Sequence, residues 1–267
     1  MIYLSKLMIL KGTEDCWPYN MDIIKNLASL EFSNPVTFIV GENGTGKSTL
    51  VESLAIKLKM PAIGRVDAAY DESMKPLRAL AESFRLTMRI KPKNKLFLRS
   101  EDFFNFILKI NREQAELADE LKRVEAEYKD KSEFTKNQAR QAFLSSSIKM
   151  KNKYGDDMLK RASHGESFIR LFLSRISPNG LYVLDEPAVP LSPLRQLTLL
   201  HIIKEMSEKY NCQFIIATHS PILLAYDKAA IYSLDSGAIE KTKWGDLESI
   251  QLLKDFLNEP ERFLDKL

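Results

Sequence analysis

The residues at positions 41–48 have the types and the spacing of a loop that binds phosphate groups. They read GENGTGKS and fit the pattern G-x-x-x-x-G-K-[ST] in full. Glycines allow successive backbone N–H groups to point at one anion, and a helix that begins beside them adds the positive end of its dipole. The residues that we expect to contact a nucleotide are Gly41, Glu42, Asn43, Gly44, Thr45, Gly46, Lys47, Ser48 and Thr49.

Two of these side chains have separate predicted tasks. The ammonium group of Lys47 should reach the β- and γ-phosphates of ATP, and the hydroxyl of Ser48 should be a ligand of Mg²⁺. The alternative is a glycine turn that happens to precede a helix. The context favours the phosphate loop, because an apolar run at 36–40 precedes it and a helical pattern follows it.

A pair of carboxylates follows a second apolar run. The segment LYVLDEP places Asp185 and Glu186 after four apolar residues. The carboxyl ends of parallel strands face the crevice where ligands bind in open α/β sheets. We expect Asp185 to hold Mg²⁺ through water, and Glu186 to orient or deprotonate an attacking water molecule. The alternative is an acidic turn that faces solvent.

A histidine ends the next apolar run, QFIIATHS. One helical segment separates this run from Asp185 and Glu186, so the two runs should be parallel strands of one sheet. His219 should then emerge beside Glu186, where its imidazole can contact a γ-phosphate. A polar cap at a strand end is the alternative.

A further polar stretch, ASHGES at 162–167, precedes the helical pattern FIRLFL. Ser163 and Glu166 have the S-x-x-E spacing of a capping box, which satisfies the free N–H groups at a helix start. A serine hydroxyl, backbone N–H groups and a helix N-terminus also favour an anion. The same loop can therefore cap its own helix and present donors to a phosphate.

The composition limits the class of protein more than its partner. The chain has 267 residues, a net charge of +3 and a pI near 8.6, which permits nucleic acid as a partner without arguing for it. The two cysteines, Cys16 and Cys212, form no motif, as is usual in a reducing compartment. No run approaches the roughly 18 apolar residues of a membrane-spanning helix. We therefore expect a cytoplasmic protein without a membrane span.

The order of the apolar runs predicts an α/β protein. Strand-like and helical patterns alternate in the C-terminal half, which favours βαβ units and a mainly parallel central sheet. The N-terminal segment YLSKLMIL reads as a first strand. The runs FRLTMRI and KLFLR are separated by lysines and Pro92, which predicts a hairpin.

A charged, glycine-free helical stretch interrupts this pattern. Leu117, Leu121, Val124 and Tyr128 form one short apolar seam, and a second helical run at about 135–151 can pack back on it. The prediction is a core formed by 1–102 and 155–267, with an inserted helical subdomain at 103–154.

Together these residues resemble the ABC-type ATPases, in particular the stand-alone soluble branch related to SMC heads. In that family the chain order is phosphate loop, helical subdomain, signature loop, Asp-Glu strand and switch histidine. The order here is the same and covers nearly the whole chain. The resemblance implies a P-loop NTPase fold with an N-terminal antiparallel β portion, and hydrolysis of ATP with Mg²⁺.

The resemblance also assigns the ASHGES stretch a task in a dimer. The family's signature loop, Leu-Ser-Gly-Gly-Gln, caps the γ-phosphate of ATP bound to the other subunit. Its counterpart here is Ser163, His164, Gly165 and Glu166. The resemblance thus implies a homodimer that closes on two ATP molecules. Relatives of this type often occur in bacterial defence or genome-maintenance systems, so the resemblance implies a partner protein, such as a nuclease or toxin, with nucleic acid as a possible partner.

The chain departs from the family pattern at several places. His164 replaces the first signature glycine, and Ser192 stands where an aspartate is common. No glutamine lies at 98–102, where the family has its Q-loop, so Arg99 or Glu101 is the expected substitute. Candidates for stacking on adenine are Trp17 and Tyr19.

Three other functions compete with an ATP-hydrolysing switch. The chain can be the ATP-binding subunit of a membrane transporter, although its departures from the family pattern lean against this. It can be a nucleotide-sensing scaffold with little turnover. A small-molecule kinase fits less well, since Glu186 and His219 suit attack by water better than by a bound acceptor.

Overall fold

The computed structural model describes residues 1–10, 16–62, 74–128, 132, 135, 141, 145 and 164–265. These residues form two compact units. The first unit contains Met1–Ser100 and Ile176–Leu267, and the second contains Glu101–Arg175. The inserted subdomain at 103–154 stays a prediction, because much of that range lies outside the described residues.

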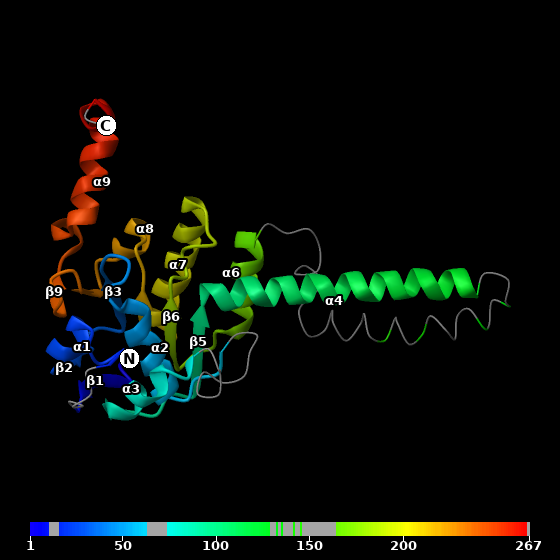
Figure 1. The fold of residues 1–267 in the computed structure, drawn as a ribbon, viewed down its shortest axis with the longest axis horizontal. Coiled ribbons are helices and arrows are strands. Elements are labelled where there is room, and N and C mark those ends of the chain that lie inside the picture. Colours follow the sequence, from blue (N-terminus) through cyan, green and yellow to red (C-terminus); the bar gives the residue numbers. More distant parts are fainter. Residues whose placement is uncertain are drawn as a thin grey trace. The chain divides into compact units, whose positions relative to one another are not determined.

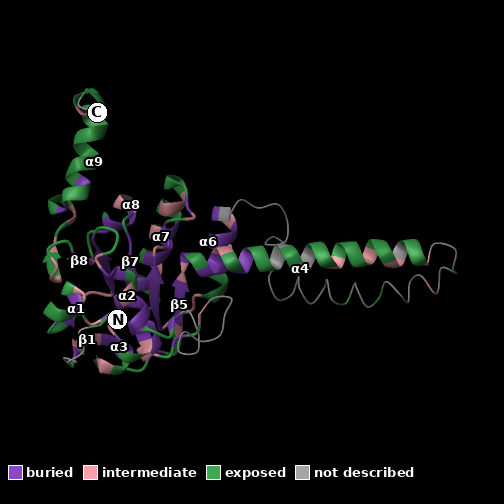
Figure 2. Cartoon of the chain, viewed as in Figure 1, coloured by how far each residue is buried: buried purple, intermediate pink, exposed green. Residues whose placement is uncertain are grey.

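The central sheet of the first unit has the strand order β5-β6-β7-β3-β8-β9 (Figure 1). Neighbouring strands from β5 to β8 are parallel, and β9 is antiparallel to β8. The strands are β5 (Asn94–Arg99), β6 (Gly180–Asp185), β7 (Gln213–Ala217), β3 (Val36–Val40), β8 (Ala230–Ser233) and β9 (Glu240–Thr242). Every residue of β3, β6 and β7 is buried, as Figure 2 shows for the middle of the sheet, which is why their sequences are continuous rather than alternating apolar runs. The predicted mainly parallel α/β fold is thus confirmed.

A second, antiparallel sheet has the order β2-β1-β4. Its strands are β2 (Ser29–Glu31), β1 (Leu4–Ile9) and β4 (Phe84–Met88). In β1 the buried side chains are Leu4, Leu7 and Ile9, so one face of the strand covers the core and the other is partly exposed. The expected N-terminal strand and antiparallel portion are present.

The predicted hairpin between residues 84 and 99 is wrong. β4 pairs with β1, whereas β5 pairs in parallel with β6 in the other sheet. Burial explains the separation: Leu96, Phe97 and Leu98 are all buried, as a strand inside a parallel sheet requires, but most of β4 is exposed. The turn at Pro92 therefore joins two sheets.

Helices connect these strands. α2 follows β3, and the crossover α7 lies between β6 and β7 (Figure 1). Because only residues 41–46 separate β3 from α2, the helix starts at the carboxyl end of β3, and most of its residues are buried. The helices of the first unit are α1 (Asp22–Asn26), α2 (Lys47–Lys57), α3 (Leu77–Ser83), α7 (Pro193–Lys209), α8 (Pro221–Leu224), a 3₁₀ turn η3 (Trp244–Asp246), α9 (Glu248–Asn258) and α10 (Pro260–Leu264).

The second unit contains α4 (Ser100–Glu127) and α6 (His164–Arg175). Phe103 of α4 meets Phe168 of α6 edge to face, with ring centroids 5.0 Å apart. Farther along α4, the predicted seam of Leu117, Leu121 and Val124 is half-buried while its neighbours are mostly exposed. Of the helical run expected at 135–151, almost all lies outside the described residues.

Within the described part of the chain, none of the helices combines the length and the apolar character needed to span a bilayer.

Candidate functional site

The predicted phosphate loop joins β3 to α2. Gly46 caps the helix with φ +99°, a left-handed conformation that side chains with a Cβ rarely adopt. A Cβ at this position would lie 2.6 Å from the side chain of Ile23 and 2.7 Å from that of Met21. The backbone conformation therefore favours glycine at position 46, and a Cβ there would also displace the ends of the Ile23 and Met21 side chains.

Lys47 lies in the curve of this loop. Its ammonium group donates hydrogen bonds to the carbonyl oxygens of Gly41, at 2.7 Å, and Glu42, at 3.0 Å, and the residue is 5% exposed. Burial lowers the pKa of Lys47, and the nearby carboxylates, first that of Glu186, oppose this effect. The loop thus holds a buried cation where an anion can approach it.

Asp235 fixes the start of the loop and was not found by sequence reasoning. Its Oδ1 accepts a hydrogen bond from the backbone N–H of Glu42 at 2.7 Å, and its Oδ2 accepts one from the hydroxyl of Ser233, also at 2.7 Å. The only signal in the sequence is an Asp-Ser-Gly turn after a short apolar run, which is common in hairpins. Its contact with a loop 193 residues earlier in the chain depends on the pairing of β3 with β8.

Ser48 and Asp185 lie together, as the metal prediction requires. The Ser48 hydroxyl donates a hydrogen bond to Oδ1 of Asp185 at 3.2 Å. Asp185 is 4% exposed, and burial, with a smaller contribution from Glu52, raises the pKa of its carboxyl to about 7. A hydroxyl and a carboxylate are oxygen donors of the kind that Mg²⁺ prefers, so this pair suits the ion.

Glu186 occupies a constrained position just beyond β6. Its φ is +49°, in the left-handed region that is unusual for glutamate. Its backbone N–H donates to the carbonyl oxygen of Ala217 at 2.9 Å, and its own carbonyl oxygen accepts from the hydroxyl of Ser100. These two bonds, one to the last residue of β7 and one from the residue that follows β5, hold the backbone in this conformation.

The side chain of Glu186 meets His219, as predicted. Nε2 of His219 lies 3.3 Å from Oε1 of the carboxylate, and the backbone N–H of His219 donates to Oε2 at 3.4 Å. Burial raises the pKa of Glu186, while His219 and Lys47 act to lower it. A partly buried carboxylate with a raised pKa, beside a histidine, can accept a proton from water. The catalytic roles of both residues remain predictions.

The region of the missing Q-loop glutamine contains a buried ion pair. A terminal guanidinium nitrogen of Arg99 lies 2.8 Å from Oε1 of Glu52 on α2, and the two side chains are 13% and 12% exposed. Arg99 is also the register partner of Asp185 across β5 and β6. Arg99 therefore lies next to the metal-ligand candidate, whereas Glu101 begins the second unit.

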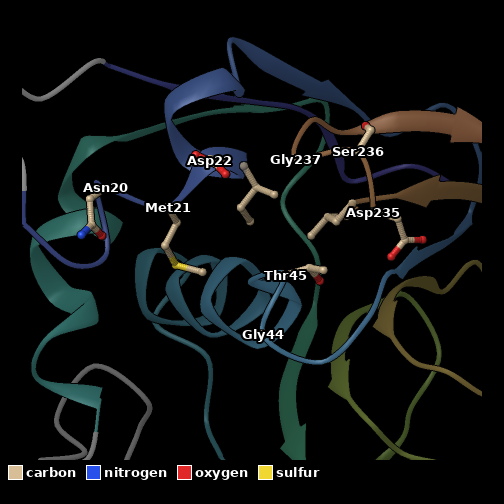
Figure 3. Close-up of a pocket in the computed structure, with 10 residues that line it drawn as sticks. Asn20, Met21, Asp22, Gly44, Thr45, Asp235, Ser236 and Gly237 are labelled. Carbon is tan, nitrogen blue, oxygen red and sulfur yellow. The ribbon is translucent and has the colours of Figure 1, made fainter.

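A pocket of about 480 Å³ opens beside the phosphate loop (Figure 3). Met21 and Asp22 line it together with Gly44, Thr45 and Asp235. The two adenine-stacking candidates are not among its lining residues: Trp17 is 51% exposed, and Tyr19 packs against the core. Met21, Ile23 and Leu234 supply apolar surface here, and such residues have no sequence signature for this task.

The proposed signature loop is only partly described. α6 begins at His164, Gly165 is buried, and Glu166 forms an ion pair with Arg170 at 2.6 Å. Ser163 lies outside the described residues, so the capping box and the phosphate contact of this loop both stay predictions.

Two family models match parts of the chain. One, described as "AAA domain, putative AbiEii toxin, Type IV TA system", matches residues 167–225, and another, described as "AAA domain", matches residues 20–61. The first range includes the Asp185–Glu186 pair and His219, and the second includes the phosphate loop.

A curated archaeal protein is also similar. It is the "Uncharacterized ABC transporter ATP-binding protein MJ1662" of Methanocaldococcus jannaschii, 26% identical over 232 residues, or 83% of this chain. The alignment covers 37% of that protein, so the chain spans little more than a third of its relative's length.

The chain also has similarity to solved structures. The Smc head domain of Pyrococcus furiosus, bound to the C-terminal domain of ScpA, is 14% identical with a TM-score of 0.47, covering 96% of this chain and all of that one. cbiO1 of Clostridium perfringens, part of the ABC transporter complex cbiONQ, is 16% identical with a TM-score of 0.46, and both chains are covered completely. The chain is thus similar to AAA-domain proteins over the two segments that contain these motifs, and to an archaeal ABC transporter ATP-binding protein over most of its length.

Proposed function

We propose that the chain binds and hydrolyses ATP, yielding ADP and phosphate, and acts as a molecular switch. One observation carries this proposal: three neighbouring strands bring the phosphate loop, Asp185 and the Glu186–His219 pair to one edge of the sheet. The order β6-β7-β3 and the Ser48–Asp185 bond of 3.2 Å support it. A nucleotide phosphate, a metal ion and an attacking water molecule would meet at this edge.

Each residue has a task in this proposal. Lys47 would exchange its bonds to the loop carbonyls for the β- and γ-phosphates, and the pocket beside Gly44 and Thr45 would receive the nucleoside. Ser48 and Asp185 would hold Mg²⁺, which when bound would neutralise charge on the phosphates. Glu186 would accept a proton from water, and His219 would hold the carboxylate in place and face the γ-phosphate.

The first test is phosphate release from ATP by the purified chain. We expect turnover without any added acceptor, and none above background in Lys47→Ala. A requirement for a small-molecule acceptor would favour a kinase, and tight binding without turnover would favour a nucleotide-sensing scaffold.

The proposal includes an ATP-dependent homodimer. Ser163, His164, Gly165 and Glu166 would cap the γ-phosphate in the other subunit, as the family resemblance implies. Light scattering should detect a dimer of Glu186→Gln with ATP and Mg²⁺, and adding Ser163→Arg should disrupt it, because a bulky cation would fill the space of the hydroxyl. Persistence of the dimer in the double variant would rule out this capping role.

We also propose that the switch is cytoplasmic and acts on a partner protein or nucleic acid, in defence or genome maintenance. The description of the model matched by residues 167–225, which mentions a toxin of a type IV TA system, supports an effector partner. Comparison of phosphate release with and without duplex DNA tests whether nucleic acid is the partner.

The name of the archaeal relative favours a second candidate, the ATP-binding subunit of a transporter. Co-purification with a membrane protein would support that candidate instead.

A further inference from the structure

We propose that Gln196 is a positioning residue that links the segment after Glu186 to the segment that carries His219. It lies in the first turns of α7, and its side-chain amide contacts both segments. This inference rests on the proposed hydrolysis of ATP, because it assigns Gln196 a part in aligning Glu186 and His219.

The amide group of Gln196 has three partners. Its Nε2 donates to the carbonyl oxygens of Leu191, at 3.1 Å, and Ala188, at 3.4 Å. Its Oε1 accepts a hydrogen bond from the hydroxyl of Ser220 at 2.7 Å. An amide has two N–H donors and one carbonyl acceptor, so all of its donors and one acceptor site are used in this one arrangement.

Both contacted segments are themselves ordered by local bonds. In the first, the N–H of Val189 donates to the carbonyl oxygen of Glu186 at 3.2 Å, and the N–H of Leu191 donates to that of Ala188 at 3.0 Å. In the second, the Ser220 hydroxyl also accepts from the N–H of Leu223 at 3.2 Å and so caps α8. Gln196 therefore joins two short turns that are already formed.

The two turns begin beside the two catalytic candidates. Ala188 follows Glu186 by two residues, and Ser220 follows His219 directly. The carboxylate of Glu186 and the imidazole of His219 lie 3.3 Å apart. The Gln196 amide is a second link between the segments that follow these two residues. Loss of the amide leaves the two segments joined by the Glu186–His219 contact and by the Glu186 N–H bond to Ala217, in a backbone with φ +49° at Glu186.

Three substitutions separate hydrogen bonding from packing. Gln196→Met keeps the side-chain volume and removes all three hydrogen bonds. Gln196→Glu keeps the acceptor and places a carboxylate against two carbonyl oxygens. Gln196→Ala removes both the hydrogen bonds and the packing of the side chain. We expect kcat for ATP hydrolysis to fall about 10- to 100-fold in all three, because small misalignment of a reacting group has costs of this size. KM for ATP should change less than about twofold, since the phosphate loop is untouched. Gln251→Ala, an exposed glutamine with one bond to Gly245, is the matched control and should have wild-type kinetics.

Two further measurements test whether Gln196 acts through the alignment of Glu186. In a Glu186→Gln background, Gln196→Met should cause almost no additional loss, because the aligned group is already gone. Hydrogen exchange at 188–191 and 220–224 should be faster in Gln196→Met than in wild type. Wild-type kcat in Gln196→Met, or an equal loss in both backgrounds, would overturn the proposal. If the wild-type chain shows no turnover at all, the proposed function fails, and the exchange measurement still tests the link: unchanged exchange would overturn it.

Discussion

At the scale of single residues, the site contains buried ionisable groups whose charged forms are disfavoured by burial. Asp185 lies almost completely inside the protein, near Glu52, and the pKa of its carboxyl is raised to about 7 by burial. Lys47 is similarly buried, and burial lowers its pKa. Each group would gain from a partner of opposite charge, which is what a metal ion and a phosphate would supply.

The raised pKa of Asp185 predicts how stability depends on pH. The carboxyl binds its proton more tightly in the folded chain than in the unfolded chain, where its pKa is near 3.8. Between pH 4 and 7 the folded state therefore binds more protons, so stability of the ligand-free protein falls as pH rises through this window. Asp185→Asn removes this contribution and should raise the free energy of unfolding at pH 8 by up to ~4 kcal/mol, with little gain at pH 4. Urea denaturation at both pH values measures the difference, with the exposed Asp227→Asn as control. Equal effects at the two pH values would contradict the assignment.

Lys47 gives a prediction about binding. Lys47→Ala removes the buried cation of the phosphate loop and should weaken ATP binding at least tenfold, a loss of about 1.4 kcal/mol or more. Lys57→Ala, in the last turn of the same helix, is the matched control and should bind like wild type. Calorimetric titration compares the three proteins, and unchanged affinity in Lys47→Ala would remove the phosphate-loop assignment.

Most of the site was predictable residue by residue. Lys47, Asp185 and His219 have local signatures, because each follows or begins a regular element whose pattern is visible in the sequence. Asp235, Met21 and Gln196 have none, since their contacts depend on strand order and on the path of chain segments far apart. The pairing of His219 with Glu186 was predictable only because both lie at strand ends separated by one helix.

At the scale of elements, the fully buried strands were the easiest to predict and the partly exposed ones the hardest. β3, β6 and β7 are continuous apolar runs, whereas β4 and β5 are close in sequence, which predicts a hairpin that does not form. Their exposure differs, and pairing follows exposure: the half-exposed strand joins the antiparallel sheet, and the buried strand joins the parallel one.

The contact between α4 and α6 is the basis of an element-scale prediction. Phe168 packs its ring against Phe103 at 5.0 Å and is fully buried. Phe168→Ala should lower the stability of the second unit by about 3–5 kcal/mol, through lost apolar contacts and the cavity left behind. Leu173→Ala, at an exposed position of the same helix, should cost less than about 1 kcal/mol. Hydrogen exchange of α4 and α6 in the two variants measures the difference, and equal protection would contradict the predicted packing.

At the scale of the whole molecule, the motifs from 41–48, 185–186 and 219 converge because β6, β7 and β3 are parallel neighbours whose carboxyl ends lie at one edge. The order of the motifs along the chain predicted this convergence. The helical stretch was not predictable in the same detail, because its apolar seam is short.

Glu186→Gln is the most direct test of this convergence. The amide keeps the size of the carboxylate but cannot accept a proton from water, while Lys47, Ser48 and Asp185 are unchanged. Single-turnover hydrolysis of ATP should be slower by about 10²–10⁴-fold, the range for loss of a general base, with ATP affinity within about threefold of wild type. Glu205→Gln, at a half-buried position of α7 where the carboxylate pairs with Lys209, is the control and should hydrolyse at the wild-type rate. Wild-type hydrolysis by Glu186→Gln would contradict the central claim that this edge of the sheet is a hydrolytic site.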